Sequence, residues 1–213
     1  MNEENSLLTG AVRPALLRYA LPIILSMVAT QFYAVADTMI IGLRLDADAL
    51  AAVSNASTVL MIFLFISGGM ELGGGLLVAA GKPTATKHEM TELLYNLLFV
   101  DEVIALLTTA VGFVTLPALL RLINTPAEVI PESTAYLSIY FAGMTGLMIY
   151  NIGSGILRAV GDSRRPFYFL VVSALLNTVL DLLFVLVFNM GVEGVAYATI
   201  IAEGVSALLV ILS

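Results

Sequence analysis

Long apolar runs are the feature that most constrains this chain. Runs of twenty or so residues with almost no charge recur about six times along the sequence. Roughly 20 helical residues cross a hydrocarbon core of about 30 Å. A helix also satisfies its own backbone hydrogen bonds, which lipid cannot do for it. The sequence therefore predicts an all-α membrane protein, a bundle of six transmembrane helices.

The composition agrees with lipid as the main solvent. Charged residues make up 12% of the chain, against about 25% in soluble domains. The first ten residues, MNEENSLLTG, lack the basic start and cleavage site of a signal peptide, so we expect the first apolar run to stay in the protein as a helix. We predict an N-terminal cytoplasmic segment, 1–18, and a six-helix lobe, 19–213, with spans at about 19–43, 50–80, 90–116, 133–157, 166–189 and 192–212.

The basic residues predict the orientation. An even number of spans places both termini on one side of the membrane. That side carries most of the basic residues, namely Arg13, Arg18, Lys82, Lys87, Arg158, Arg164 and Arg165, while Arg44 and Arg121 fall on the other. Since loops rich in Lys and Arg stay in the cytoplasm, we expect both termini to be cytoplasmic, in a prokaryotic plasma (inner) membrane.

Three polar residues interrupt the fifth span at intervals of four. Ser173, Asn177 and Asp181 therefore share one stripe of a helix. Polar and ionisable side chains at membrane depth are costly unless they face a partner or a water-filled cavity. This stripe predicts one wall of an ion site.

Residues from other spans lie at a similar depth. At 1.5 Å per helical residue, Asp37 lies about 10 Å from the outer end of its span, and Asp181 and Thr199 lie about 12 Å from the outer ends of theirs. Tyr136 and Tyr140 lie about 8 and 14 Å below Pro131 on the same count. Glu203, four residues beyond Thr199, extends that face inward.

These residue types suit a small cation. Two carboxylates in a low dielectric repel each other, so either one keeps a proton or both share a cation. Asn177, with Asp37 and Asp181, offers oxygen ligands of the kind that Na⁺ accepts. The predicted coupling ion is H⁺ or Na⁺. The plainer interpretation of a single residue such as Thr199, Ser173 or Tyr140 is a hydrogen bond that only holds helices together.

A proline, a pair of glycines and three acids within the spans are less easily assigned a role. Pro22 favours a kink near the start of the first span and is a candidate hinge, or a fixed kink. Gly69 and Gly73 form a GxxxG pair, which predicts close helix packing. Glu71, Asp101 and Glu102 fall within spans and receive no role. Without a nucleophile and base pairing, a cofactor fingerprint or metal-ligand spacing, we expect no enzyme, no cofactor and no nucleic-acid partner.

Several stretches resemble a known transporter family. They are residues 20–24, 35–38 with Gly42, 50–53, 157–163 with Pro166, Asn177 with Asp181, and 194–199. Their order and spacing are similar to those of the multidrug and toxic compound extrusion (MATE) transporters along nearly the whole chain. Residues 71–87 depart from that pattern, being a residue or two short and lacking the glutamine usual before the loop glycine.

The resemblance implies an antiporter that exports organic cations or drugs against an inward flow of H⁺ or Na⁺, with twelve helices in two lobes. It implies a cation site at Asp37, Asn177, Asp181 and Thr199 with Tyr136, and a helix that bends at Pro22. The six spans are half of that architecture. We therefore expect a second six-helix lobe as partner, most simply a parallel second copy in a homodimer.

Two alternatives remain. One is a non-transporting lobe, truncated or engineered, or a membrane assembly module. The other is a lipid-linked saccharide flippase of the wider superfamily, which would need a cationic cavity. The basic residues lie mostly at loops and helix ends, which disfavours it.

Overall fold

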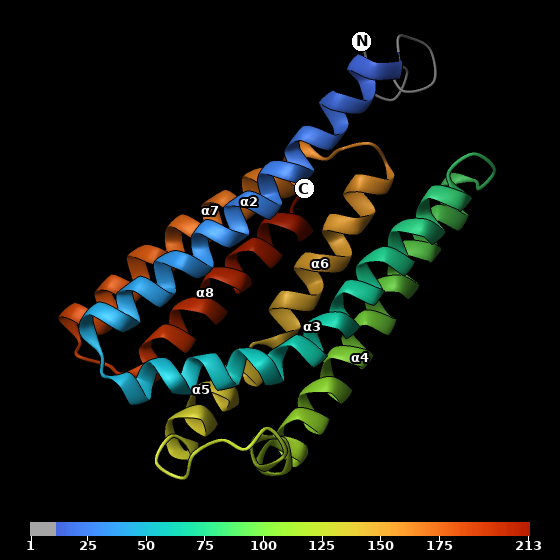
Figure 1. Cartoon of the computed structure of the whole chain (residues 1–213). Coiled ribbons are helices and arrows are strands. Elements are labelled where there is room, and N and C mark those ends of the chain that lie inside the picture. Colours follow the sequence, from blue (N-terminus) through green and yellow to red (C-terminus); the bar gives the residue numbers. More distant parts are fainter. Residues whose placement is uncertain (1–11) are drawn as a thin grey trace.

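The computed structural model describes residues 12–213, which are almost entirely helical (Figure 1). The elements are α2 (Val12–Arg44), α3 (Ala47–Gly81), α4 (Lys87–Leu122), α5 (Ile130–Ala142), α6 (Met144–Ala159), α7 (Arg164–Leu182), a π-helical turn η1 (Leu183–Val187) and α8 (Val192–Ile211). Every predicted span falls on one of these helices or on a joined pair. The expected all-α membrane fold is confirmed.

The fourth predicted span, 133–157, is not one straight helix. It consists of α5 and α6, which meet at Gly143 with a bend of 50°. Five helices are long and apolar enough to cross a membrane by themselves, and this bent pair provides the sixth span. The helix that begins at Val12 also continues the first span backwards into the predicted N-terminal segment. Residues 1–11 of that segment lie outside the described part.

Side chains fix where the long helices begin. Asp46 precedes α3, and its Oδ1 accepts a hydrogen bond of 2.9 Å from the backbone N–H of Ala49. At the start of α4, Thr86 and Glu89 form a reciprocal capping box, which satisfies two backbone donors that have no partner inside the helix. Gly161, with φ of +98°, makes the turn between α6 and α7, a conformation that glycine adopts without strain.

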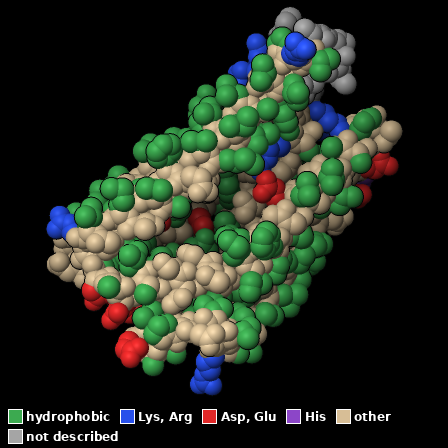
Figure 2. All heavy atoms as spheres, in the orientation of Figure 1, with side chains coloured by type: hydrophobic (Ala, Val, Ile, Leu, Met, Phe, Trp, Pro, Cys, Tyr) green, Lys and Arg blue, Asp and Glu red, His purple; other side chains and the backbone are tan. Residues whose placement is uncertain are grey.

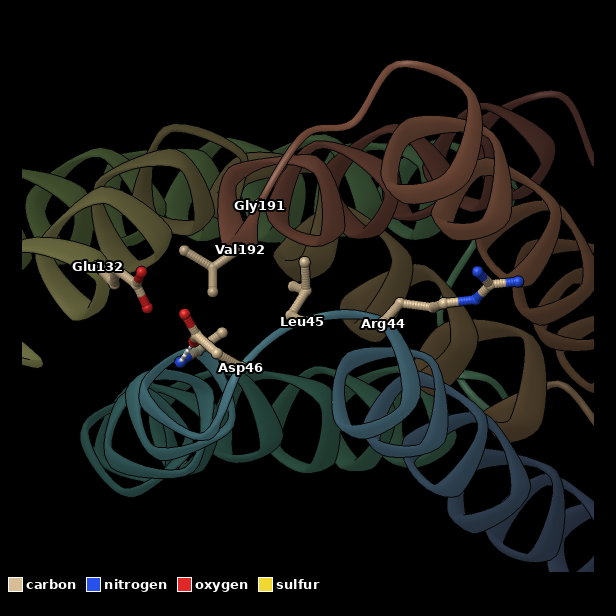
Figure 3. A pocket seen from close by; sticks show the side chains of 7 residues that line it. Arg44, Leu45, Asp46, Glu132, Gly191 and Val192 are labelled. Atoms are coloured by element: carbon tan, nitrogen blue, oxygen red, sulfur yellow. Dashed lines mark hydrogen bonds between the residues drawn. The ribbon is translucent and has the colours of Figure 1, made fainter.

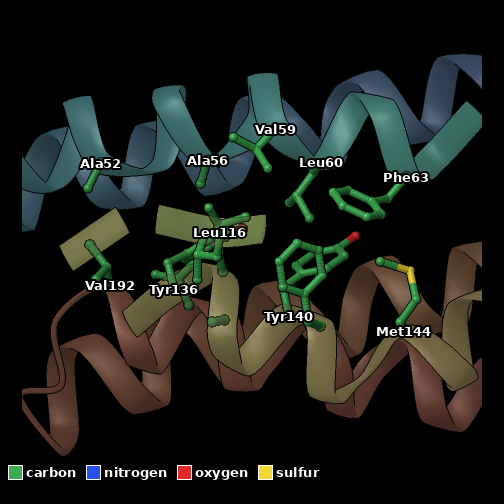
Figure 4. Packing of buried hydrophobic residues seen from close by; sticks show 14 of the residues in the cluster. Ala52, Ala56, Val59, Leu60, Phe63, Leu116, Tyr136, Tyr140, Met144 and Val192 are labelled. Atoms are coloured by element: carbon green, nitrogen blue, oxygen red, sulfur yellow. The ribbon is translucent and has the colours of Figure 1, made fainter. Parts of the chain in front are cut away.

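The helices form two groups joined through the middle of the bundle (Figure 1). In one, α2 packs mainly against α7, and α7 packs on α8; in the other, α3 and α4 pack on α6. The helix α8 also packs along α5 and α6, which connects the groups. Figure 4 shows part of the core, where Val59, Leu60 and Phe63 of α3 meet Tyr140 of α5 and Met144 of α6.

Glycines allow the closest helix contacts, but they are not the predicted pair. A Cβ on Gly155 of α6 would collide with the backbone carbonyl of Glu71 on α3, and one on Gly75 would lie 3.1 Å from the carbonyl oxygen of Gly155. Around Gly69 and Gly73, by contrast, there is nothing within 4 Å. The GxxxG prediction was wrong for packing within the described chain, because that face of α3 points outward.

Large apolar side chains cover the outside of the bundle. On α2, only Ile40 and Ile41 are buried, while residues such as Phe32, which is 72% exposed, face outward. Figure 2 shows apolar side chains over most of the visible face, with Lys, Arg, Asp and Glu gathered mainly at the ends. A surface of this kind is stable in lipid and not in water. The protein is therefore an integral membrane protein.

Candidate functional site: an acid and tyrosine cluster inside the bundle

A cluster of acids, tyrosines and amide or hydroxyl groups lies between α2, α5, α7 and α8. Its members interact with one another through hydrogen bonds or at short electrostatic range, and they are Tyr33, Asp37, Tyr136, Tyr140, Asn177, Asp181, Thr199 and Glu203. Seven of the eight were predicted from the sequence. The structure brings them together, and their roles in ion binding stay a prediction.

The centre of the cluster is a pair of carboxyl groups. Asp37 on α2 and Asp181 on α7 lie within hydrogen-bonding reach of each other. Asp181 and Asn177, one turn away, are both fully buried. Among the described residues, no donor other than a shared proton reaches either oxygen of Asp181, Oδ1 of Asp37 or Oδ1 of Asn177. Four buried oxygens in this part of the bundle thus have no partner among the described residues, and a proton or a small cation would satisfy the two carboxyl groups.

The hydroxyl of Thr199 connects the three helices around this pair. It accepts a hydrogen bond of 3.2 Å from the Tyr33 hydroxyl and one of 3.3 Å from Nδ2 of Asn177. It donates to the carbonyl of Val195 in its own helix, at 3.0 Å. Thr199 therefore holds the amide of Asn177 by its Nδ2, which leaves Oδ1 without a partner among the described residues.

Tyr33 was missed by the sequence analysis. It lies beside Asp37 and also interacts with Glu203 and Tyr136. The available signal was its position four residues before Asp37, which places both side chains on one face of the helix. Tyrosine is common near membrane interfaces, so that position alone did not single it out.

Glu203 forms the edge of the cluster farther from Arg44. Its Oε1 accepts a hydrogen bond of 2.9 Å from the Tyr140 hydroxyl, while Oε2 has no partner within the described chain. The ring of Tyr140 stacks on that of Tyr136, with centroids 6.2 Å apart. Tyr136 in turn lies near Asp37 and Asp181. The two tyrosines therefore connect Glu203 to the pair of Asp37 and Asp181.

Two further predicted residues lie at the margin. The hydroxyl of Ser173 donates to the carbonyl of Ala202 on α8, at 2.9 Å, so it holds α7 against α8 and does not face the acids through that bond. Pro22 lies inside α2, which is helical on both sides of it, and the hydroxyl of Ser26 donates to the Pro22 carbonyl at 2.8 Å. Its role as a hinge stays a prediction.

The backbone next to Asp181 is irregular. Directly after α7 the chain forms the π-helical turn η1, in which the N–H of Phe188 donates to the carbonyl of Leu183. Such insertions are rare and occur often at functional sites. Here the wider turn follows within two residues of Asp181, and it sets the direction in which the end of the span continues toward α8.

A pocket of about 500 Å³ opens at the end of the bundle beyond the cluster (Figure 3). Arg44, Asp46 and Glu132 line it together with Leu45, Ala49, Gly191 and Val192. Arg44 follows Asp37 by seven residues, or about 10 Å along the helix. The pocket therefore lies about two helical turns from Asp37, toward the Arg44 end of α2, and is separate from the acid and tyrosine cluster.

The structure explains two of the three acids that the sequence left without a role. Glu71 forms an ion pair with Arg158, which ties α3 to α6 close to Gly155, where the two backbones leave no room for a Cβ. Glu102 accepts a hydrogen bond of 3.5 Å from the hydroxyl of Thr145. Asp101 is fully buried, and neither of its oxygens has a partner among residues 12–213.

Known relatives match this chain over most of its length. The probable multidrug resistance protein YpnP of Bacillus subtilis is 34% identical over 205 residues, which cover 93% of this chain and 45% of that protein. The probable multidrug resistance protein YoeA of the same organism is 32% identical, over 86% of this chain and 41% of its own length. The chain thus spans less than half the length of these relatives.

Solved structures show the same fold. The outward-facing conformation of a multidrug resistance MATE family transporter of the MOP superfamily superposes with a TM-score of 0.89 and 25% identity, over 99% of this chain and 46% of that one. The family model MatE matches residues 22–183, which include Pro22, Asp37, Asn177 and Asp181. With that match over most of the six-helix bundle, the chain belongs to the MatE family.

Proposed function

We propose that the chain is one lobe of a cation-coupled antiporter that exports organic cations or drugs. The observation that carries the proposal is the pairing of Asp37 with Asp181 inside the apolar bundle, on two helices that pack against each other. Two ionised carboxylates within hydrogen-bonding reach of each other are unstable in an apolar bundle without a counter-charge. Uptake and release of one cation therefore changes the energy of the α2–α7 contact directly.

The coupling ion is H⁺ or Na⁺. A proton shared by Asp37 and Asp181 would satisfy the pair, and Na⁺ would also use Oδ1 of Asn177, which has no other partner in the described structure. Both ions bind at the same oxygens, so each would favour the arrangement that keeps the carboxyl groups together. A ligand shifts a conformational equilibrium only by the difference between its affinities for the two states. Without the ion, repulsion between the two carboxylates would move α2 away from α7.

Pro22 gives α2 a place to bend when the pair separates. It removes one backbone hydrogen bond about 22 Å along the helix from Asp37. Except near its Arg44 end, α2 has few buried side chains. A bend at Pro22 that moves the segment with Asp37 would therefore draw only Ile40 and Ile41 out of the core.

The second lobe completes the transporter. Relatives of this chain are more than twice its length, and six spans place both termini on the same side of the membrane. A second copy would then lie parallel to the first, related by an axis along the membrane normal, a symmetry known from transporters built of repeats. On the distribution of basic residues, the termini and Arg158 face the cytoplasm.

Export from cells tests the proposal. Asp181→Asn keeps the size of the side chain and removes its charge, and we expect it to abolish gradient-driven export of cationic dyes at unchanged expression. Glu193→Gln is the matched control, because it neutralises an exposed acid in the first turn of α8 and should export as the wild type does. Full export by the Asp181→Asn variant would refute the mechanism.

The mass of the protein in mild detergent separates this function from its alternatives. A dimer that exports supports two paired lobes. A stable monomer without ion-coupled flux would instead identify a non-transporting lobe or an assembly module.

A further inference from the structure

One face of α4 is buried along most of the helix. It consists of Leu97, Asp101, Ala105, Thr108, Gly112, Leu116 and Leu120, a series with helical spacing. This face packs against α3, α5 and α6. Among its buried residues, Asp101 is the single ionisable one, and it lies near the middle of the predicted span.

Asp101, like Asp181, receives no hydrogen bond from any residue in 12–213, but it has no counterpart to the Asp37 carboxyl that lies beside Asp181. Its side chain is fully buried within the chain itself, before any lipid is considered. Neither Oδ1 nor Oδ2 accepts a hydrogen bond from any described residue. An isolated buried carboxylate is strongly unfavourable in such a setting, whereas the neutral acid costs only what an unpaired hydroxyl and carbonyl cost.

Within residues 12–213, no Lys, Arg or His side chain donates a hydrogen bond to Asp101. The neighbouring Glu102, on the same helix, can only repel a charge on Asp101. On α3, Glu71 is paired with Arg158 of α6, so that this arginine is already occupied. On α5, the hydroxyl of Tyr140 is directed to Glu203.

The bent span of α5 and α6 lies between Asp101 and the acid and tyrosine cluster. On one side of Gly143, Tyr140 donates to Glu203 of α8; on the other, Thr145 donates to Glu102 of α4. The hydroxyl of Thr109 on α4 donates to the carbonyl of Phe141, beside the bend, at 3.1 Å. Hydrogen bonds thus flank the bend at Gly143 on both sides. Before the bend they lead to Glu203 on α8, and after it they lead to Glu102, the neighbour of Asp101, on α4.

We propose that Asp101 is a second intramembrane proton-binding site, separate from the Asp37–Asp181 pair, and that it carries its proton in the conformation described here. The ligand is a proton because the site lacks what a metal ion needs. No group of three or more His, Cys, Asp or Glu side chains in residues 12–213 is placed to hold a metal ion. The helical carbonyls nearby are used in the hydrogen bonds of α4.

The proposal predicts a movement when the proton leaves. A charged Asp101 next to Glu102 would place two negative charges on adjacent residues in an apolar interface. That state is stable only if α4 turns or shifts so that water or a cation reaches the carboxylate. Loss of the proton would therefore loosen α4 from α6 at the bend.

Infrared spectroscopy of the full chain in lipid nanodiscs tests this directly. A protonated carboxyl group has a C=O stretching band that is separate from the bands of a carboxylate. At neutral pH, we expect Asp101→Asn to lose one carboxyl's share of that band relative to the wild type. Glu92→Gln, which neutralises an exposed acid on the same helix, should lose none. Asp101→Leu removes the carboxyl without adding amide donors, and it provides the same comparison if the asparagine variant does not fold.

An unchanged band in the folded Asp101 variants would overturn the proposal, because Asp101 would then be ionised. The result does not depend on the function proposed above. The Asp101 contribution should persist in an Asp181→Asn background, so the two proposals can fail separately.

Discussion

The hydroxyl of Tyr140 on α5 donates a hydrogen bond of 2.9 Å to Glu203 on α8, three residues before the chain bends at Gly143. This contact joins the bent span to the helix that crosses it. It also places a third acid, Glu203, at the edge of the site that holds Asp37 and Asp181. One hydrogen bond therefore belongs both to the site and to the packing of the bent span on α8.

Tyr140→Phe removes the donor to Glu203. Because the other oxygen of Glu203 already lacks a partner among the described residues, we expect the variant to lose about 1–3 kcal/mol of stability, the usual cost of leaving a buried polar group unpaired. Thermal unfolding in detergent measures the change. Tyr95→Phe, at a tyrosine that is 71% exposed, serves as the control, and equal stability of the two variants would contradict the role given to this bond.

Tyr33→Phe tests the residue that the sequence analysis missed. The variant keeps the ring but loses the hydrogen bond to Thr199, while Asn177 still holds that threonine. A single hydrogen bond contributes about 0.5–1.5 kcal/mol, so the initial rate of export should fall severalfold at low ion concentration. Tyr197→Phe on the outside of α8 is the comparison. If both variants export at the wild-type rate, Tyr33 takes no part in the site.

Gly155→Ala and Gly73→Ala compare two glycines with opposite surroundings. A methyl group on Gly155 would collide with the backbone of Glu71, whereas Gly73 has open space around it. We expect the first variant to lose about 1–3 kcal/mol through forced separation of α3 and α6. The second should gain up to about 1 kcal/mol from helix propensity. The reverse order of melting temperatures would show that α3 packs through its other face.

Glu71 and Arg158 form the ion pair that joins α3 to α6. Both side chains are partly buried, so removing either one should cost about 1–3 kcal/mol, between the values for exposed and fully buried pairs. In a double-mutant cycle with Glu71→Gln and Arg158→Gln, the double variant should lose less than the two single losses added together. Simple additivity of the two losses would mean that the pair does not form in the membrane.

The helices were largely predictable from the sequence, and their packing was not. Six apolar runs of sufficient length leave few alternatives to six spans. The bend at Gly143 was missed, because glycine is common in apolar spans and no proline marks the position. It becomes explicable from α8, since a Cβ on Gly143 would collide with Ile200, and from Thr109, which satisfies a carbonyl beside the break. Both contacts join residues far apart in the sequence.

Counting residues from the ends of the spans predicted which site residues lie at the same depth in the membrane. Asp37, Asp181 and Thr199 were expected at one level, and the structure brings them together. Depth does not reveal the direction of a side chain. For that reason Ser173 was grouped with the site, although it bonds to the backbone of α8. The separate states of Glu71, Glu102 and Asp101 also required the structure, because only contacts between helices distinguish a paired acid from an unpaired one.

The most direct test of the account is the exchange of both central carboxyl groups. Wild type, Asp37→Asn, Asp181→Asn and the double variant would be reconstituted in vesicles, and export of an organic cation would be driven by an imposed H⁺ or Na⁺ gradient. Since the two carboxyl groups hold one cation together, the account predicts that each single variant falls to the same background rate as the double variant, as residues that act as a unit do. Gradient-driven export at the wild-type rate by either single variant would contradict it.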